Sequence, residues 1–442
     1  MAYPVRIIIK ALYIDHEAFG ETTPQLPFRL THHRGASFYS RRMETPRSAA
    51  AEHVNRLTVS WLRDVTDPPQ VLSGVGLWPL LAALRLGTEP GTDDELAAAT
   101  GTAHDELAAE LAALVTLLND SRTMRIALGI WSGQRIRLDP AWLAQVPVGL
   151  AGQLTGDAAT DQAMLDSWAS TNTAGLIPTF PLTVDSDVDV VLASALALRT
   201  RWREPFMDEP WHFNSGPWSG ERTWHGLTCV TEDMANLRVW DDGSTTLTIP
   251  GEADVDVVLV MGDVDTEPTE VLARAVENLS EGGGYRTGTD LTVGEEANGV
   301  TVTRERDADP DPVPRLEVTT VAFDVGADHD ILDSAGVLGL LRSLDPATSS
   351  LTGLTVEPVE PVVVTQARQR AVARFSAVGF EAAAVTAMAW MAGAMLPSPE
   401  DGWRTVVRVT FNRPFGYLVV HRPTGVMPVV GWVDTPARWP EE

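Results

Sequence analysis

Apolar residues between about residue 53 and residue 173 recur at the spacing of amphipathic helices. The inward-facing residues of three such helices are expected to be Val54, Leu57 and Trp61; Leu107, Leu111, Leu114 and Leu118; and Leu165, Trp168 and Ala169. The third helix should run from Gln162 to Thr173, with Gly175 as its C-terminal cap. The first third of the chain is therefore predicted to be mainly helical.

Apolar runs of strand length follow. Val188 to Leu198 is apolar at nearly every position, which favours a central strand covered on both faces over an edge strand. Two helices, Pro268 to Leu279 and Asp330 to Leu341, are expected among the strands. The other predicted strands are Thr245 to Ile249, Asp254 to Met261, Leu316 to Val325, Pro361 to Thr365, Ala371 to Phe375 and Val406 to Phe411.

The chain is predicted to end in a buried hairpin, since two apolar runs flank the turn-forming triplet Pro423-Thr424-Gly425. Helices followed by strands predict a single domain of the α+β class over residues 51–442, where no linker interrupts the pattern. Residues 1–50 lack sustained periodicity. We expect an N-terminal extension there that is disordered or mis-annotated, with Met43 as an alternative true start.

The acidic composition of the chain excludes some classes of binding partner. The 442 residues carry a net charge of −27 and a pI near 4.6, which opposes binding to nucleic acid or anionic membranes and favours a monomer. Lys10 is the only lysine among 33 basic residues, and we interpret the preference for arginine as coding bias. The lone Cys229 cannot form an internal disulfide, so packing must supply the stability.

Motifs of enzyme chemistry do not emerge from the sequence. A nucleophile elbow, a phosphate-binding glycine loop, a zinc helix and a Cys-x-x-Cys pair are all missing, although a dispersed triad stays open. The pair His32-His33 lacks further ligands at fixed spacing, so a solvated loop is favoured over a metal site. We predict a protein that is not an enzyme and that uses no cofactor or metal.

Residues 379–397 do not fit an ordinary core element. They read Gly-Phe-Glu-Ala-Ala-Ala-Val-Thr-Ala-Met-Ala-Trp-Met-Ala-Gly-Ala-Met-Leu-Pro and carry one charge. One interpretation is a buried helix, because Ala, Met and Glu are good helix formers. The other is an exposed segment that later becomes a strand, with Phe380, Ala382, Ala384, Thr386, Met388 and Trp390 turned to one face.

The flanks of this segment favour the second interpretation, because they resemble the serpin family. Residues 411–425, Phe-Asn-Arg-Pro-Phe-Gly-Tyr-Leu-Val-Val-His-Arg-Pro-Thr-Gly, are similar to the family's C-terminal signature, and Gly431-Trp-Val-Asp-Thr-Pro436 continues it. Gln369 to Phe375 resembles the strand that leads into the serpin hinge. Leu192 to Trp202, Leu165 to Ile177 and Leu72 to Thr88 resemble further family segments, so the likeness covers about residues 51–436.

The resemblance implies a serpin fold, with N-terminal helices packed on three β-sheets and an exposed reactive-centre loop near the C-terminus. It also implies a metastable suicide inhibitor of serine proteases, whose loop inserts into the central sheet after cleavage and carries the acylated protease with it. Counting along the hinge places the scissile bond at Gly393-Ala394, with Met391, Met395 and Leu396 as alternative specificity residues. The implied partner is a protease of elastase-, chymotrypsin- or subtilisin-like specificity, since arginine and lysine are missing from residues 379–403.

The implied hinge consists of Gly379, Phe380, Glu381, Ala382, Ala383, Ala384, Val385 and Thr386. The implied sheet-opening region consists of Ser73, Ser194, Trp202 and Gln369. Three departures from the family bear on inhibition. Phe380 is bulky where a small or β-branched residue is usual, and Ala377 and Val378 replace acidic residues. Ser194 and Gln369 likewise stand where Asn and His are expected.

Two alternatives to inhibition stay open at this point: a non-inhibitory serpin with a substrate, carrier or structural role, and an unrelated hydrolase. Localisation is open as well. The family resemblance favours the extracellular space, whereas the interrupted apolar run of residues 1–10 is too short for a secretory signal and favours the cytoplasm.

Overall fold

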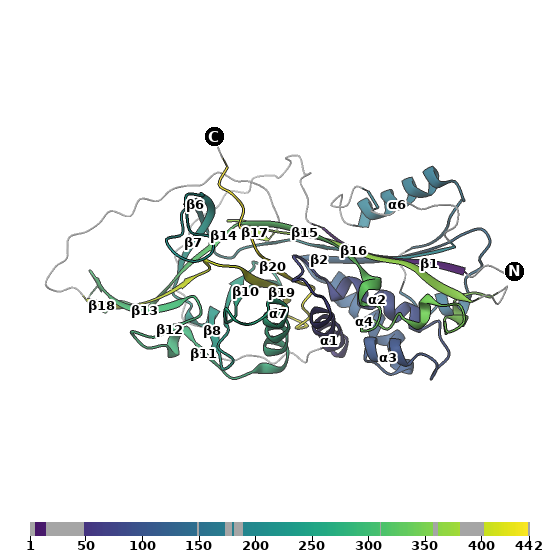
Figure 1. Ribbon diagram of the computed structural model, residues 1–442, viewed down its shortest axis with the longest axis horizontal. Coiled ribbons are helices and arrows are strands. Elements are labelled where there is room, and N and C mark those ends of the chain that lie inside the picture. The colour runs from purple at the N-terminus through teal and green to yellow at the C-terminus, as the bar shows by residue number, and fades with distance from the viewer. Residues whose placement is uncertain are drawn as a thin grey trace.

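Helices and three β-sheets make up the described part of this computed structural model, which confirms the α+β class (Figure 1). The described residues are 5–14, 48–147, 150–172, 179–180, 189–309, 311–356, 361–380 and 402–440. The largest sheet, called here the central sheet, has helices on both faces: α1 to α4 lie on one side of it and α6 on the other (Figure 1).

The central sheet has eight strands in the order β3-β2-β4-β1-β16-β17-β5, with β15 also paired to β16. Its strands are β1 (Val5–Ile14), β2 (Met124–Ser132), β3 (Leu150–Gln153), β4 (Val190–Leu198), β5 (Thr200–Arg201), β15 (Phe323–Asp330), β16 (Val362–Phe375) and β17 (Gly379–Phe380). All nine residues of β4 are buried, which confirms the central strand predicted from its unbroken apolar run.

The other two sheets have six strands each, in the orders β11-β8-β9-β10-β19-β20 and β12-β13-β18-β14-β7-β6. The first contains β8 (Leu237–Trp240), β9 (Thr245–Pro250), β10 (Val255–Met261), β11 (Tyr285–Thr287), β19 (Phe415–His421) and β20 (Val429–Val433). The second contains β6 (Met207–Trp211), β7 (Trp224–Thr231), β12 (Glu296–Ala297), β13 (Val300–Asp307), β14 (Arg315–Val321) and β18 (Gly402–Thr410). The antiparallel pair β19–β20 confirms the C-terminal hairpin.

The helices are α1 (Ala49–Asp64), α2 (Gly74–Arg85), α3 (Asp94–Thr100), α4 (His104–Asn119), α5 (Pro140–Leu143), α6 (Ala158–Asn172) and α7 (Pro268–Glu277). The four leucines predicted for the inner face of α4 are all buried. Every residue of α2 is buried, because the helix lies between the central sheet and the other helices. On the opposite face of the sheet, Trp168 of α6 packs edge-on against Trp131 of β2 with ring centroids 5.0 Å apart.

The predicted helix over Asp330 to Leu341 is wrong. Residues up to Asp330 belong to β15, and only a short 3-10 turn, Ile331–Ser334, follows. The apolar spacing of Ile331, Ala335 and Leu338 comes from irregular chain packed on the core, and it imitates a helical face. Gly339 has a left-handed φ of 72°, and a Cβ there would lie 2.5 Å from the Glu95 carbonyl oxygen.

Strand boundaries also differ. The single strand predicted over Leu316 to Val325 is two strands, since β14 ends in one sheet and β15 begins in another. Conversely, the two short strands predicted over 361–365 and 371–375 are one continuous strand, β16. The polar residues between them lie on β16 as well, because that strand is half-exposed over its middle.

The N-terminal stretch departs most from expectation. We expected residues 1–50 to form an extension outside the domain, yet Val5–Ile14 is a strand in the middle of the central sheet, drawn in purple beside β16 (Figure 1). Its apolar run Ile7 to Ile9 suits a position covered on both faces, and all three isoleucines are fully buried.

Candidate functional site

The candidate site is the position between β4 and β16, the strands that carry the predicted sheet-opening residues Ser194 and Gln369. In the described residues these strands do not pair with each other, because β1 lies between them and runs parallel to both. Ala11 of β1 stands opposite Ser194 on one side and opposite Gln369 on the other. We call the strand position between β4 and β16 the sheet slot.

A buried set of hydrogen bonds, the Ser73 cluster, joins Ser73, Gly76, Ser194, Gln369 and Pro428 beneath this slot. The Ser73 amide donates to Gln369 Oε1 at 2.8 Å, and Gln369 Nε2 donates to the Ser73 carbonyl at 2.8 Å. Ser73 Oγ donates to the Pro428 carbonyl at 2.7 Å and accepts from the Gly76 amide at 3.1 Å, which caps α2. Ser194 Oγ donates to the Gly76 carbonyl.

Three of the four predicted sheet-opening residues therefore meet at the start of α2, and all three are fully buried. Their polar atoms are paired with one another or with the backbone, as buried polar groups must be to avoid a desolvation penalty. Although Gln369 stands where a histidine was expected, its amide satisfies both the donor and the acceptor of Ser73.

Trp202, the fourth predicted residue, lies apart from the Ser73 cluster at the turn that joins β16 to β17. Its indole Nε1 donates to the Ser376 carbonyl at 2.8 Å, and its ring lies 4.9 Å from that of Phe375. The carbonyls of Ala377 and Val378 accept from the amides of Phe206 and Trp202 at 2.8 and 3.1 Å. Backbone atoms thus hold this turn where the family has acidic side chains.

The first two hinge residues form β17 in line with the sheet slot. Gly379 pairs with Arg201, and Phe380 pairs with Thr200 on one side and Phe375 on the other, all antiparallel. A Cβ at Gly379 would lie 2.4 Å from the Thr200 carbonyl oxygen, so only glycine fits there. Phe380 is 1% exposed, with its ring 6.1 Å from that of Tyr417.

The other predicted site residues lie outside the described part of the chain. These are the remaining hinge residues Glu381, Ala382, Ala383, Ala384, Val385 and Thr386, the bond Gly393-Ala394, and the alternatives Met391, Met395 and Leu396. Their roles remain predictions.

Sequence reasoning missed Lys10, which lies within the sheet slot on β1. Its side chain is fully buried, and among the described residues its Nζ has no hydrogen-bond partner. The pKa of Lys10 is lowered to about 8, chiefly by burial; Asp328 and Asp330 oppose this shift, and Arg368 and Arg370 contribute to it. In the sequence, Lys10 stands alone between the apolar residues Ile7 to Ile9 and Ala11 to Ile14, and this pattern could have identified it.

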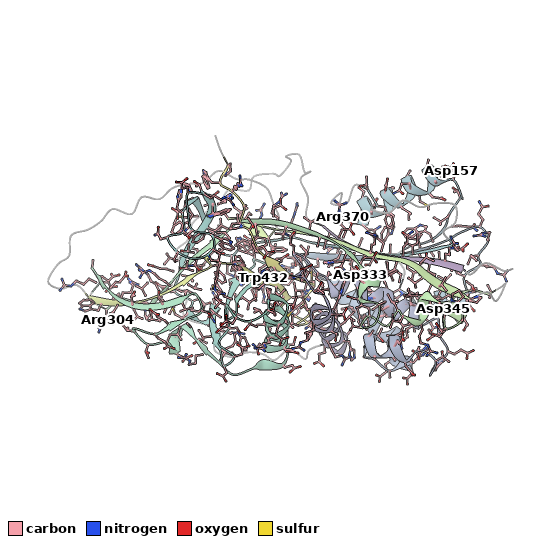
Figure 2. The ribbon with its side chains drawn as sticks, in the orientation of Figure 1. Asp157, Arg304, Asp333, Asp345, Arg370 and Trp432 are labelled. Carbon is pink, nitrogen blue, oxygen red and sulfur yellow. The ribbon has the colours of Figure 1, made fainter. Side chains whose placement is uncertain are left out.

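Lys10 lies on the α6 side of the central sheet, because it alternates with Ala11, which faces α2. Its neighbour in register on β16 is Arg368, and Arg370 follows two residues later on the same face. Figure 2 labels Arg370 on the side of β16 from which α6 projects, with Asp157 at the outer end of that helix. The paired polar cluster and the unpaired lysine thus occupy opposite faces of one slot.

Other chemistry is sparse in the described residues. Nowhere in them do three or more His, Cys, Asp or Glu side chains gather as metal ligands. Burial raises the pKa of Cys229 to about 12, which keeps its thiol protonated at neutral pH. None of the helices described has the length and apolarity to cross a membrane.

Comparison with known proteins identifies the architecture. The family model of the serpins (serine protease inhibitors) matches residues 52–217 and 313–436, about two thirds of the chain. The chain belongs to the serpin family. The match spans the strands that border the slot and the C-terminal hairpin, so the fold that the sequence resemblance implied is confirmed.

Solved serpin structures share this fold at low sequence identity. Thyroxine-binding globulin in complex with thyroxine superposes with a TM-score of 0.65 and 15% identity, covering 88% of this chain and 99% of that one. Tengpin, a thermophilic serpin in its native state, gives a TM-score of 0.66 and 13% identity, covering 87% and 94%. Among curated proteins, no sequence matches this chain significantly.

Proposed function

We propose that this serpin inhibits serine proteases as a suicide substrate. The observation that best supports the proposal is the placement of the hinge: Gly379 and Phe380 already pair as a strand between β16 and β5. Because β5 directly follows β4, a loop that continued in this direction would enter the sheet slot. On this proposal the chain needs no catalytic residue of its own.

In the proposed reaction the protease supplies the nucleophile. Its serine Oγ attacks the carbonyl carbon before the scissile bond, an ester forms, the C–N bond breaks, and the protease histidine delivers the proton to the departing amine. Insertion of about fifteen loop residues at about 3.3 Å each would carry the esterified protease about 50 Å. Distortion of its oxyanion hole then prevents hydrolysis of the ester.

The proposed target is a protease with an apolar primary pocket. The scissile bond is proposed at Gly393-Ala394, and Met391, Met395 and Leu396 are the alternatives for the specificity residue. Small or medium-sized apolar residues suit elastase-, chymotrypsin- or subtilisin-like pockets. A trypsin-like pocket needs a cationic residue, which residues 379–403 lack.

A second candidate, a serpin that is cleaved without trapping, is favoured by one feature. Phe380 is fully buried with its ring 6.1 Å from that of Tyr417, so any shift of β17 during loop insertion would have to repack this ring and would slow insertion. Since inhibition is a race between insertion and ester hydrolysis, slower insertion converts an inhibitor into a substrate.

The experiment is incubation of the protein with elastase, chymotrypsin and subtilisin, followed by denaturing gel electrophoresis and intact-mass analysis. The expected product is a covalent adduct of the protease with the chain, accompanied by a released C-terminal peptide that begins after the cut. The mass of that peptide locates the scissile bond. Cleavage within residues 388–397 without an adduct, for all three proteases, would overturn inhibition and support the substrate function.

A further inference from the structure

Two segments of this chain enter the sheet slot from opposite ends. β1 fills the slot from Val5 to Ile14 and ends opposite Ala197 of β4. β17 begins at the other end, where Phe380 stands opposite Thr200. Since β15 pairs with the other edge of β16 as far as Phe375, β17 and β1 lie on the same edge of that strand.

The register of β17 shows where the two segments meet. Gly379 is opposite Arg201 and Phe380 is opposite Thr200, so each further loop residue would move one position back along the strand that leads to β4. Residues 381 and 382 would reach Arg199 and Leu198. Residue 383 would then fall opposite Ala197, the position that Ile14 of β1 already holds.

We propose that β1 is an internal competitor of the reactive-centre loop, occupying the sheet slot until it is displaced. This inference rests on the proposed function for its consequence, because only an inserting loop needs the slot. The occupancy itself rests on the strand pairing. Loop insertion beyond two further residues then requires β1 to leave, so retention of β1 sets the rate of trapping.

The N-terminal half of β1 is held firmly. The Arg6 amide donates to Asp189 Oδ2 at 3.1 Å, and the Asp189 amide donates to the Arg6 carbonyl at 3.2 Å. Ile7 and Ile9 pack in the main core, while Ile8 packs with Trp168 on the α6 side. A fully buried side chain of this size contributes about 1.5–3 kcal/mol.

The next residue of β1, Lys10, fits less well. Lys10 places an amine without a described hydrogen-bond partner inside the sheet, near Arg368 and Arg370 of β16 as well as Asp328 and Asp330 of β15. Within the better-held half, the pairing with β16 is interrupted as well, because the register shifts between Ile7 and Ile8 and skips Thr365. A strand that contains a buried amine without a hydrogen-bond partner and an interrupted ladder is suited to displacement by a second strand.

Ala11 offers the most direct way to eject β1. Its side chain points toward Gly76 at the start of α2, since a Cβ built on Gly76 would lie 3.5 Å from the Ala11 Cβ. A large ring at position 11 would therefore collide with the backbone of a fully buried helix. Ala11→Phe should drive β1 out of the slot, and Ala11→Gly serves as the matched control that leaves it in place.

The sole lysine makes the position of β1 measurable. An amine-acylating reagent can react in this chain only at Lys10 and at the N-terminal amine, and mass analysis after digestion separates the two sites. Lys10 should be protected in the wild type and in Ala11→Gly. In Ala11→Phe we expect acylation at Lys10 to be about tenfold faster or more, with the N-terminal amine unchanged as the internal standard. Equal rates at Lys10 in the wild type and Ala11→Phe would overturn the proposal.

A second measurement follows the slot itself. A synthetic, N-acetylated peptide of residues 381–395 should be taken up by Ala11→Phe, with a raised midpoint of thermal unfolding, and should not be taken up by the wild type. Should Ala11→Phe fail to fold, Ile9→Pro serves instead, because proline removes a ladder amide from β1 alone. Uptake by the wild type at the same rate would overturn the competitor role.

Protease trapping separates this inference from the proposed function. Faster adduct formation by Ala11→Phe than by Ala11→Gly supports both. Adducts formed at equal rates by the two variants would overturn the competitor role while leaving inhibition intact. If no variant forms an adduct, inhibition fails, whereas protected Lys10 and peptide uptake only by Ala11→Phe still establish β1 as the occupant of the slot.

Discussion

The two faces of the sheet slot differ in how their polar groups are satisfied. On the α2 face, Ser73, Ser194 and Gln369 pair every described polar side-chain atom with a partner, and Ala11 fits closely beneath them. On the α6 face, Lys10 is equally buried, and its Nζ has no hydrogen-bond partner among the described residues. The hydrogen bonds on the α2 face therefore stabilise the filled slot, whereas Lys10 on the α6 face destabilises β1, the strand that fills it.

The largest expected loss of stability comes from removing the hydrogen bonds of the Ser73 cluster on the α2 face. Gln369→Leu would leave the amide and the carbonyl of Ser73 buried without partners, at a cost of about 2–4 kcal/mol in the free energy of unfolding. Urea denaturation followed by tryptophan fluorescence measures the loss. Gln366→Leu, an exposed position on the same strand, is the control and should change stability by less than about 0.5 kcal/mol. Equal effects at both positions would contradict a special role for the Ser73 cluster.

On the α6 face, replacement of Lys10 should have the opposite effect and raise the stability of the fold. Lys10→Met keeps an unbranched side chain and removes the buried charge, so the free energy of unfolding should rise by about 1–3 kcal/mol at pH 7. Lys10→Arg, which cannot release its proton, should be less stable than the wild type. The same urea experiment decides the sign, and a loss of stability in Lys10→Met would mean that the ammonium has a stabilising partner.

The pH dependence of stability tests the state of Lys10 through an effect that is smaller at each pH step. Because the folded pKa of Lys10 is about 8 and its ordinary value is 10.5, the unfolded chain binds more protons in this window. Stability of the wild type should therefore rise by up to about 1.4 kcal/mol per pH unit between those values, relative to Lys10→Met. Urea midpoints of both proteins at pH 7.5, 9 and 10 test this. Parallel curves would show that Lys10 does not titrate abnormally.

Local pattern was sufficient for elements whose burial is regular along the chain. The leucines of α4 repeat with helical period and face the core, and β4 is apolar throughout because both of its faces are covered. Family resemblance then placed Ser73, Ser194 and Gln369 in one region, and the structure brings these three together. Trp202 was assigned to the same region but lies at the hinge turn.

Elements that depend on partners far away in the sequence could not be predicted from local pattern. β1 becomes a strand only because β4 and β16, both far away in the sequence, supply its partners. The apolar run of β1 is too short for its hydrophobic periodicity to indicate a strand or its partners. The segment after Asp330 failed for a different reason, since its apolar spacing is helical while Gly339 and the close approach to Glu95 prevent a helix.

The large distance in sequence between β1 and its partner strand β16 has a consequence for how the chain folds. The loop follows β16 immediately and can pair with it as a hairpin, whereas β1 must close a chain of more than 340 residues to reach the same edge. Closure entropy grows by only about 0.6 kcal/mol for each doubling of length, so this separation weighs little at equilibrium. It weighs heavily on rate, because contacts distant in sequence form slowly. Synthesis from the N-terminus makes β1 available before β16 and the loop exist, whereas refolding of the complete chain starts both segments together and gives the local hairpin the advantage.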